Sequence, residues 1–226
     1  MGEAKRRREN AKPTVYHHTS TLRTNLIWMS GVIQVEGAGK PAIHPLLGEI
    51  RTDALSRRKM TDFPPVAWFT TRLEIPKCLI ESSFFIVKET GEIEEIKIDE
   101  QTVNLISLHR VALGFVIEDI DLTPWPEYYG YSTPEGRELN EVAQAAGDNP
   151  DDWYISEVPI DVLRVSEFYS SRTKLKPKLE RMPSYIEDIK RMVVQCRENN
   201  AYIPPSWLSR AEAILLAQKA GVPVYE

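Results

Sequence analysis

The chain has 226 residues, of which 42% are hydrophobic, and a formal net charge of -5 at pH 7. This length and apolar content are enough to bury a core, and they predict one domain of catalytic size with a helical tail. The longest apolar runs, "LIWM" and "AILLA", are far shorter than the roughly 20 residues that span a bilayer. The basic N-terminus is also not followed by the apolar core of a signal peptide. We therefore expect a soluble, cytoplasmic protein without a membrane partner.

The cysteines and the short motifs limit the chemistry that the chain can carry. Cys78 and Cys196 lie far apart in apolar segments, which is typical of buried thiols rather than of a disulfide or a metal site. The sequence contains no P-loop, no G-x-G-x-x-G, no H-E-x-x-H and no paired C-x-x-C motif. Triphosphatase, Rossmann and zinc-site functions therefore have no support, and we expect no metal.

Charge is distributed unevenly. Residues 1–12 carry five basic residues against Glu3 and Glu9, whereas residues 118–161 are dominated by Asp and Glu, with Arg137 as their single base. A basic arm can bind nucleic acid or another polyanion by releasing counterions. A solvated tail that aids solubility is the alternative interpretation.

The first elements after this tail are a strand and a helix. "TVYHH" reads as a short strand, and Ser20 or Thr21 is a good N-cap for a helix with apolar residues at helical spacing. Gly31 can end that helix in the left-handed conformation. Residues 33–65 show no clear period, so we expect a loop there, and its length indicates a functional role.

The middle of the chain predicts several strands. "PPVAWFTTRLE" is a β-branched and aromatic run opened by two prolines, and "LHRVALGFVIEDID" is a second strong strand. "SSFFIVKET" and "EIEEIKID" flank Gly91 and predict a hairpin. A short helix follows, with Pro134 near its start and Gly147 at its end.

The last third predicts strands and then helices. "DWYISEVPIDVLRVSEFYS" supplies one or two strands, and two amphipathic helices follow, "SYIEDIKRMVVQCREN" and "PSWLSRAEAILLAQKAG". Consecutive strands without crossover helices pair antiparallel, so this order predicts an α+β fold. We expect a basic flexible tail over residues 1–13, an α+β domain over 14–175 and a helical extension over 176–226.

Three strand segments carry polar residues inside apolar runs. They contain His17 with Thr19, Trp68 with Thr70, and Glu157. Each also has a structural interpretation, since histidines and tryptophans pack in cores and a strand glutamate can simply face solvent.

The first two segments resemble a known family. Tyr16-His17-His18-Thr19-Ser20, followed by a helix that ends in a glycine and an aliphatic pair, looks like the opening of the ADP-ribosyltransferase superfamily. "AWFTTR" is similar to the second motif of that superfamily. The resemblance lies mainly within residues 14–75.

The resemblance implies split antiparallel sheets with NAD bound in the cleft between them. It implies that His17 hydrogen-bonds the nicotinamide ribose and that Thr19 helps to fix the adenine-side ribose or the strand itself. Tyr16 belongs to the same cofactor-binding strand. Trp68 would stand where a tyrosine normally stacks on the nicotinamide, and Thr70 would support the site. The implied activity is a glycosyltransferase reaction that transfers ADP-ribose from NAD to a protein, nucleic-acid or nucleobase acceptor, or to water.

Cleavage of the glycosidic bond of NAD develops positive charge on the ribose, which a carboxylate stabilises. The resemblance places a glutamate on a late strand, and we choose Glu157, with Glu167 as the competing candidate. The N-terminus of the helix after His17 can attract the pyrophosphate, assisted by Arg23, Arg51 or Arg57.

Two alternatives remain open. A non-catalytic module would use the same cleft to hold a nucleotide or a protein partner. An RNA 2'-phosphotransferase, which resembles the same superfamily, would use the basic tail on RNA. Dimerisation through the C-terminal helices is a further prediction, and the sequence does not identify the acceptor.

Overall fold

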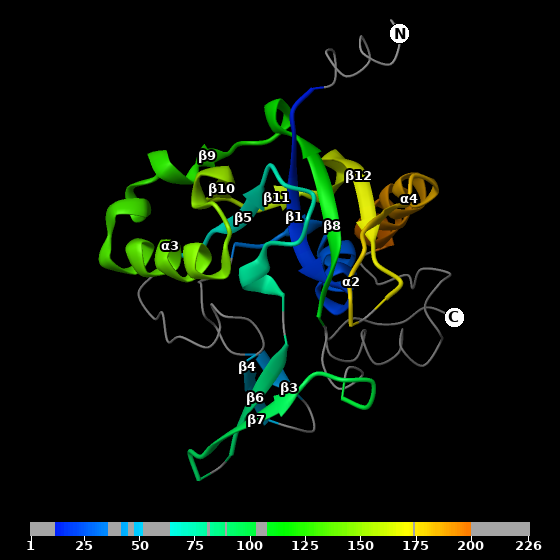
Figure 1. The fold of residues 1–226 in the computed structure, drawn as a ribbon. Coiled ribbons are helices and arrows are strands. Elements are labelled where there is room, and N and C mark those ends of the chain that lie inside the picture. The colour runs from blue at the N-terminus through cyan, green and yellow to red at the C-terminus, as the bar shows by residue number, and fades with distance from the viewer. Residues whose placement is uncertain are drawn as a thin grey trace, which may run out of the picture.

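The structure is a computed structural model, and it describes residues 12–35, 42–44, 48–51, 64–80, 82–88, 90–102, 108–173 and 175–199. Its main body is a seven-stranded sheet in the order β13-β12-β8-β1-β5-β10-β9, and every neighbouring pair is antiparallel (Figure 1). The strands are β1 Thr14–Ser20, β5 Ala67–Thr70, β8 His109–Val116, β9 Thr123–Pro124, β10 Trp153–Ser156, β12 Val165–Ser170 and β13 Glu180–Arg181.

Two smaller sheets complete the strand content. β2 (Val32–Ile33) pairs with β11 (Ile160–Asp161), and a four-stranded sheet has the order β3-β4-β6-β7. Its strands are β3 Ala42–His44, β4 Gly48–Arg51, β6 Ser83–Val87 and β7 Ile93–Lys97. Figure 1 shows this sheet below the seven-stranded sheet. The hairpin of β6 and β7 around Gly91 is confirmed, with Gly91 at φ 81°.

The expectation of a structureless segment between residues 33 and 65 was wrong in part. β3 and β4 lie within it, and β4 pairs with β6, more than 30 residues further along the chain. Strands of three and four residues are too short to show an alternating pattern in the sequence, which explains the error. The stretch from residue 152 to 170 likewise contains three strands, β10, β11 and β12, rather than one or two.

The described residues form three α-helices and several short 3-10 turns. The α-helices are α2 Thr21–Ser30, α3 Pro134–Ala146 and α4 Ser184–Asn199. The 3-10 turns are η1 Lys77–Leu79, η2 Ile117–Asp119, η3 Trp125–Glu127, η4 Tyr129–Ser132, η5 Pro150–Asp152 and η6 Val162–Arg164. The expected caps of α2 are confirmed, because the Ser20 side chain accepts from the Arg23 amide and Gly31 has a φ of 72°. An α+β fold is thereby confirmed.

Helices cover the two faces of the main sheet in different places. α2 and α4 pack on one face with Val15, Phe69 and Leu113, in the largest hydrophobic cluster. α3 packs over β5 and β10 in a second cluster that contains Trp125 and Ile155. Neighbouring residues of β5 enter different clusters, so α3 lies on the opposite face from α2 and α4. Both cysteines are buried thiols outside any disulfide, as expected.

Helix α4 comes from the predicted helical extension, and it folds against the sheet. Its residues Ile189, Met192, Val193 and Cys196 belong to the same hydrophobic cluster as β1 and β8. The second predicted C-terminal helix and most of the basic tail lie outside the described residues. Among the described residues, no helix is both long and apolar enough to cross a membrane.

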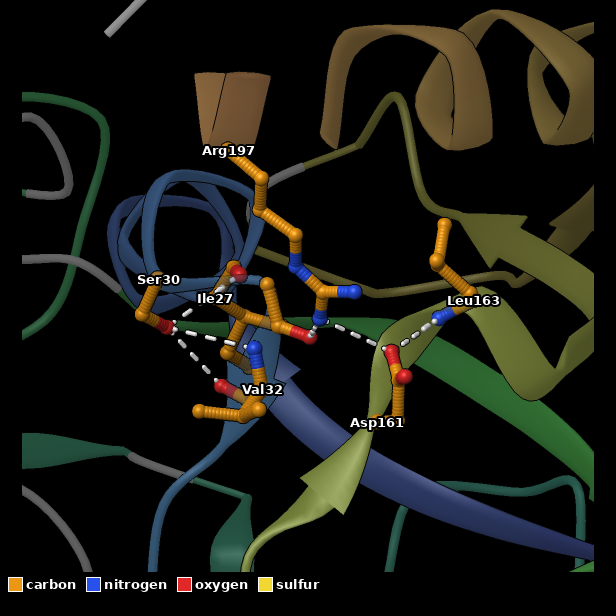
Figure 2. A network of polar contacts seen from close by, with 7 residues as sticks. Ile27, Ser30, Val32, Asp161, Leu163 and Arg197 are labelled. Carbon is orange, nitrogen blue, oxygen red and sulfur yellow. Dashed lines mark hydrogen bonds and ion pairs between the residues drawn. The ribbon is translucent and has the colours of Figure 1, made fainter. Parts of the chain in front are cut away.

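Arg197 at the end of α4 ties three elements together (Figure 2). Its guanidinium donates to the Gly31 carbonyl at 2.8 Å and to Asp161 Oδ1 at 2.9 Å. Asp161 also accepts from the Leu163 amide at 2.9 Å, and the Gly31 carbonyl accepts from the Val162 amide at 3.0 Å. The end of α2, the β2-β11 pair and α4 are therefore joined at one point.

Candidate functional site

The adjacent histidines of β1 are each held by a backbone carbonyl of the segment that includes β5. His17 Nδ1 lies 2.9 Å from the Trp68 carbonyl oxygen, and His18 Nε2 lies 3.1 Å from that of Arg72. A carbonyl oxygen only accepts a hydrogen bond, so the ring nitrogen that faces it must carry the proton. In the neutral rings, His17 Nε2 and His18 Nδ1 are therefore unprotonated and can accept hydrogen bonds.

Both imidazoles are neutral near pH 7. Burial lowers the pKa of His17 to about 4, and the positive charges of Arg23 and His109 lower it further, against the raising effect of the Trp68 carbonyl. Burial lowers the pKa of His18 to about 4 in the same way. His17 stays partly exposed, whereas His18 is buried. His18 Nδ1 has no hydrogen-bond partner in the described part of the chain.

His17 lies next to the single residue pair that joins β1 to β5. β1 pairs with β8 through seven residues, from Thr14 to Ser20, but with β5 only through Tyr16 and Thr70. Next to that pair, the His17 side chain reaches across to the backbone of β5, and its ring lies 5.5 Å from that of Phe69. The side chain of His17 thus supplies a link between two strands whose ladder stops after one pair.

The N-terminus of α2 follows this point at once. The Ser20 hydroxyl accepts from the Arg23 amide at 3.2 Å, and the Thr24 hydroxyl donates to the Ser20 carbonyl at 2.8 Å. The first turn contains no acidic residue, so no carboxylate of the helix neutralises its positive end. Arg23 is exposed, while Thr19 is only 2% exposed and packs inside. The exposed positive groups here are therefore Arg23 and the helix end itself.

The hydrogen bond between Trp68 and His17 uses the backbone carbonyl of Trp68. The indole ring of Trp68 packs against Trp125 and Trp153, with ring centroids 4.9 and 5.6 Å away. Phe69, the next residue, contacts His17. Successive residues of a strand point to opposite faces, so the rings of Trp68 and Phe69 lie on different faces of β5. Thr70 is buried and accepts from the Arg72 amide at 3.2 Å, which shapes the end of the strand.

Glu157 lies just beyond the end of β10, in a bend rather than in the strand as expected. It is exposed, and its Oε1 accepts from the Tyr128 hydroxyl at 3.2 Å. Among the described residues, this carboxylate forms no other hydrogen bond or ion pair. Burial, the Tyr129 hydroxyl and the negative charge of Glu157 raise the pKa of Tyr128, which keeps that phenol a donor.

Glu167 belongs to a different cluster, which includes Tyr16. Its Oε2 accepts from the Tyr16 and Tyr169 hydroxyls at 3.2 and 3.1 Å, and its Oε1 accepts from Arg181 at 2.9 Å. Gly114 lies between Tyr16 and Glu167 in the register, and a Cβ there would come within 2.8 Å of the Glu167 Cβ. The glycine therefore allows the two side chains to meet across β8.

The structure thus brings some predicted site residues together and separates others. His17, the Trp68 carbonyl and the start of α2 adjoin one another, whereas Tyr16 and Glu167 form the separate cluster. Sequence reasoning missed Tyr169 and Arg181 as partners of Glu167. The period-2 spacing of Glu167 and Tyr169 was a usable signal, but Arg181 lies on another strand and leaves none.

No group of three or more potential metal ligands occurs among the described residues. Comparisons of the chain with family models, with curated proteins and with solved structures find no match.

Proposed function

We propose that this protein is an ADP-ribosyltransferase-like enzyme that binds NAD beside His17 and cleaves its glycosidic bond. ADP-ribose would then pass to a macromolecular or nucleobase acceptor, or to water. The observation that carries this proposal is the neutral His17, fixed by the Trp68 carbonyl at 2.9 Å with Nε2 left as an acceptor.

An acceptor nitrogen suits a sugar hydroxyl. The ribose hydroxyls of NAD are donors, and His17 Nε2 accepts from one of them in a fixed direction. Cleavage of the bond to nicotinamide makes the ribose cationic, and a neutral imidazole adds no opposing positive charge. A pKa of about 4 keeps His17 in this form throughout the physiological range.

The start of α2 is the part of the site that suits the pyrophosphate. Helix N-termini attract phosphate groups through their free amides and the helix dipole. The first turn of α2 has no carboxylate, and Arg23 adds an exposed guanidinium. The ribose contact and the phosphate contact would then come from consecutive parts of the chain.

Between the two candidate acids, the contacts favour Glu157. Both oxygens of Glu167 are occupied, by two tyrosines and by Arg181. Glu157 uses one oxygen, toward Tyr128 of the second hydrophobic cluster, so its other oxygen can still accept a hydrogen bond from a ligand. Its action on the ribose is the part of the proposal that the Glu157→Gln variant tests. Trp68 serves in this proposal mainly by holding His17, since its ring is engaged with Trp125 and Trp153.

The test is to incubate the protein with NAD and to measure nicotinamide by chromatography, with candidate acceptors and with water alone. We expect Glu157→Gln to bind NAD and to release no nicotinamide. Glu141→Gln, which removes an exposed carboxylate of α3, is the matched control and should behave like the unmodified protein. Glu167→Gln tests the competing candidate acid, and we expect this variant still to release nicotinamide.

Two outcomes would contradict the proposed enzymatic activity. If NAD raises the melting temperature and no nicotinamide appears with any acceptor, the protein is a non-catalytic nucleotide-binding module. If NAD neither stabilises the protein nor is cleaved, NAD binding beside His17 is refuted as well.

A further inference from the structure

The outer edge of the four-stranded sheet is open among the described residues. β7 is the last strand in the order β3-β4-β6-β7, and β6 is its strand partner. Figure 1 shows the hairpin of β6 and β7 below the main sheet. Ile93 is 60% exposed, and Glu94, Glu95 and Lys97 are exposed as well. A strand edge of this kind can pair with another strand.

Hydrogen bonds at both ends of the hairpin show which way the backbone of β7 faces. The Ile98 amide donates to the Ser82 carbonyl at 3.0 Å, and the Glu92 carbonyl accepts from the Lys88 amide at 2.9 Å. The register between the two strands runs without a shift. Because the backbone groups of an antiparallel strand alternate in direction, the even-numbered residues of β7 face β6.

The odd-numbered residues Ile93, Glu95 and Lys97 therefore direct their amides and carbonyls away from β6. The Lys97 carbonyl accepts from the Thr102 hydroxyl at 2.7 Å, which agrees with this direction and leaves the oxygen a second lone pair. The side chains of Glu95 and Lys97 form no ion pair with any described residue. The edge thus presents outward backbone groups between two unpaired charges of opposite sign.

We propose that two copies of this chain pair antiparallel along β7, with Ile96 of one copy opposite Ile96 of the other. The twofold axis of this dimer passes between the two Ile96 residues. Glu95 of each copy then lies opposite Lys97 of the second copy, and each of these pairs exchanges two backbone hydrogen bonds. The four-stranded sheets of the two copies join into one continuous sheet.

The charges of β7 favour this register over its neighbours. Glu95 meets Lys97 twice in the dimer, and opposite charges directly across antiparallel strands attract. A twofold pairing centred on Glu94, Glu95 or Lys97 places like charges opposite each other, which is destabilising. The same charges that discourage an unrelated strand from pairing at this edge therefore fit a second copy of β7.

The other face of β7 adds an apolar contact. Ile96 and Ile98 are partly buried, and they pack against Phe84 and Leu108 in the small cluster of this sheet. The proposed register places the two Ile96 side chains beside each other, so the clusters of the two copies meet. Two strands of five residues bury less than a standard interface of about 1,600 Å², so we expect a reversible dimer with a Kd of about 10–100 µM.

Sedimentation velocity of the full chain, at concentrations from below to well above this Kd, tests the pairing through charge reversal. Lys97→Glu and Glu95→Lys each turn both attractive pairs into repulsive ones, so each variant should stay monomeric where the unmodified protein dimerises. An equimolar mixture of the two variants should dimerise, because all facing charges in the mixed dimer are again opposite. The variant with both substitutions in one chain should dimerise for the same reason.

Lys178→Glu is the matched control, since it makes the same charge change at an exposed lysine between β12 and β13 and should dimerise like the unmodified protein. Circular dichroism of each variant checks that these exposed substitutions keep the fold. An unmodified protein that is monomeric at every concentration would overturn the proposal. A dimer that both single variants retain would overturn it too, as would a mixture of the two that stays monomeric.

Discussion

Replacement of Gly31 by alanine tests the junction that Arg197 makes. Gly31 has a φ of 72°, and a Cβ at this position would lie 2.6 Å from Arg197 Nε. The left-handed conformation alone costs about 1–2 kcal/mol for a residue with a side chain. The displaced guanidinium also gives up its hydrogen bonds to the Gly31 carbonyl and Asp161, which together contribute about 1 kcal/mol at this partly exposed position.

The expected loss of stability is therefore about 2–3 kcal/mol, or a fall in melting temperature of about 4–12 °C for a chain of this size. Urea unfolding followed by circular dichroism measures the free energy, and a thermal scan measures the temperature. Gly91→Ala is the matched control, because Gly91 also has a positive φ of 81° but no atom within 4 Å of the added Cβ.

Comparison of the two variants separates the cost of the left-handed backbone from the cost of losing the Arg197 hydrogen bonds. Gly91→Ala should show the backbone cost alone, and Gly31→Ala should exceed it by the Arg197 contribution. In an Arg197→Ala background, the cost of Gly31→Ala should fall to that of the control. A loss at Gly31 that is no larger than the loss at Gly91 would refute the reasoning.

Three further predictions concern stability. Burial raises the pKa of Asp161, but hydrogen bonds from Arg197 and the Leu163 amide together hold that pKa below its usual value. Because the folded-state pKa is lowered, this carboxylate stabilises the fold above its unfolded pKa of about 4 and loses that effect as pH falls through the folded value. Asp161→Asn should thus be less stable than the unmodified protein at pH 7 and approach it in acid, and a constant difference across a urea-unfolding pH series would contradict this. Gly114→Ala should cost about 1–3 kcal/mol, because its Cβ would overlap that of Glu167; an unchanged urea midpoint would argue against the close approach. Asp148→Ala should cost about 1–3 kcal/mol, because its carboxylate accepts from the Lys77 and Cys78 amides at 2.9 and 2.8 Å, and a thermal scan without a shift would count against that estimate.

Elements with local signals could be predicted from the sequence. Ser20 and Gly31 mark the ends of α2 through side-chain and backbone chemistry within a few residues, and Gly91 marks the turn between β6 and β7. The amphipathic pattern of α4 identifies its buried face, since Ile189 and Met192 are buried as their spacing predicts.

Elements that depend on distant partners could not be predicted. β4 pairs with β3 and with the distant β6, and both β3 and β4 are too short to show a period of their own. The contact between Tyr16 and Glu167 joins residues 151 positions apart. The tautomer of His17 depends on a carbonyl 51 residues away, so the sequence could indicate that this histidine matters but not which nitrogen is the acceptor.

The most direct test of the central claim is the affinity of NAD for the protein, measured by titration calorimetry at pH 7.5 on the full chain, on His17→Ala and on His17→Gln. If His17 Nε2 accepts a hydrogen bond from the ribose, alanine should weaken binding about fivefold or more. Glutamine, which keeps an acceptor oxygen, should lose less. No binding to the unmodified protein, or equal affinity in all three, would contradict an NAD site beside His17.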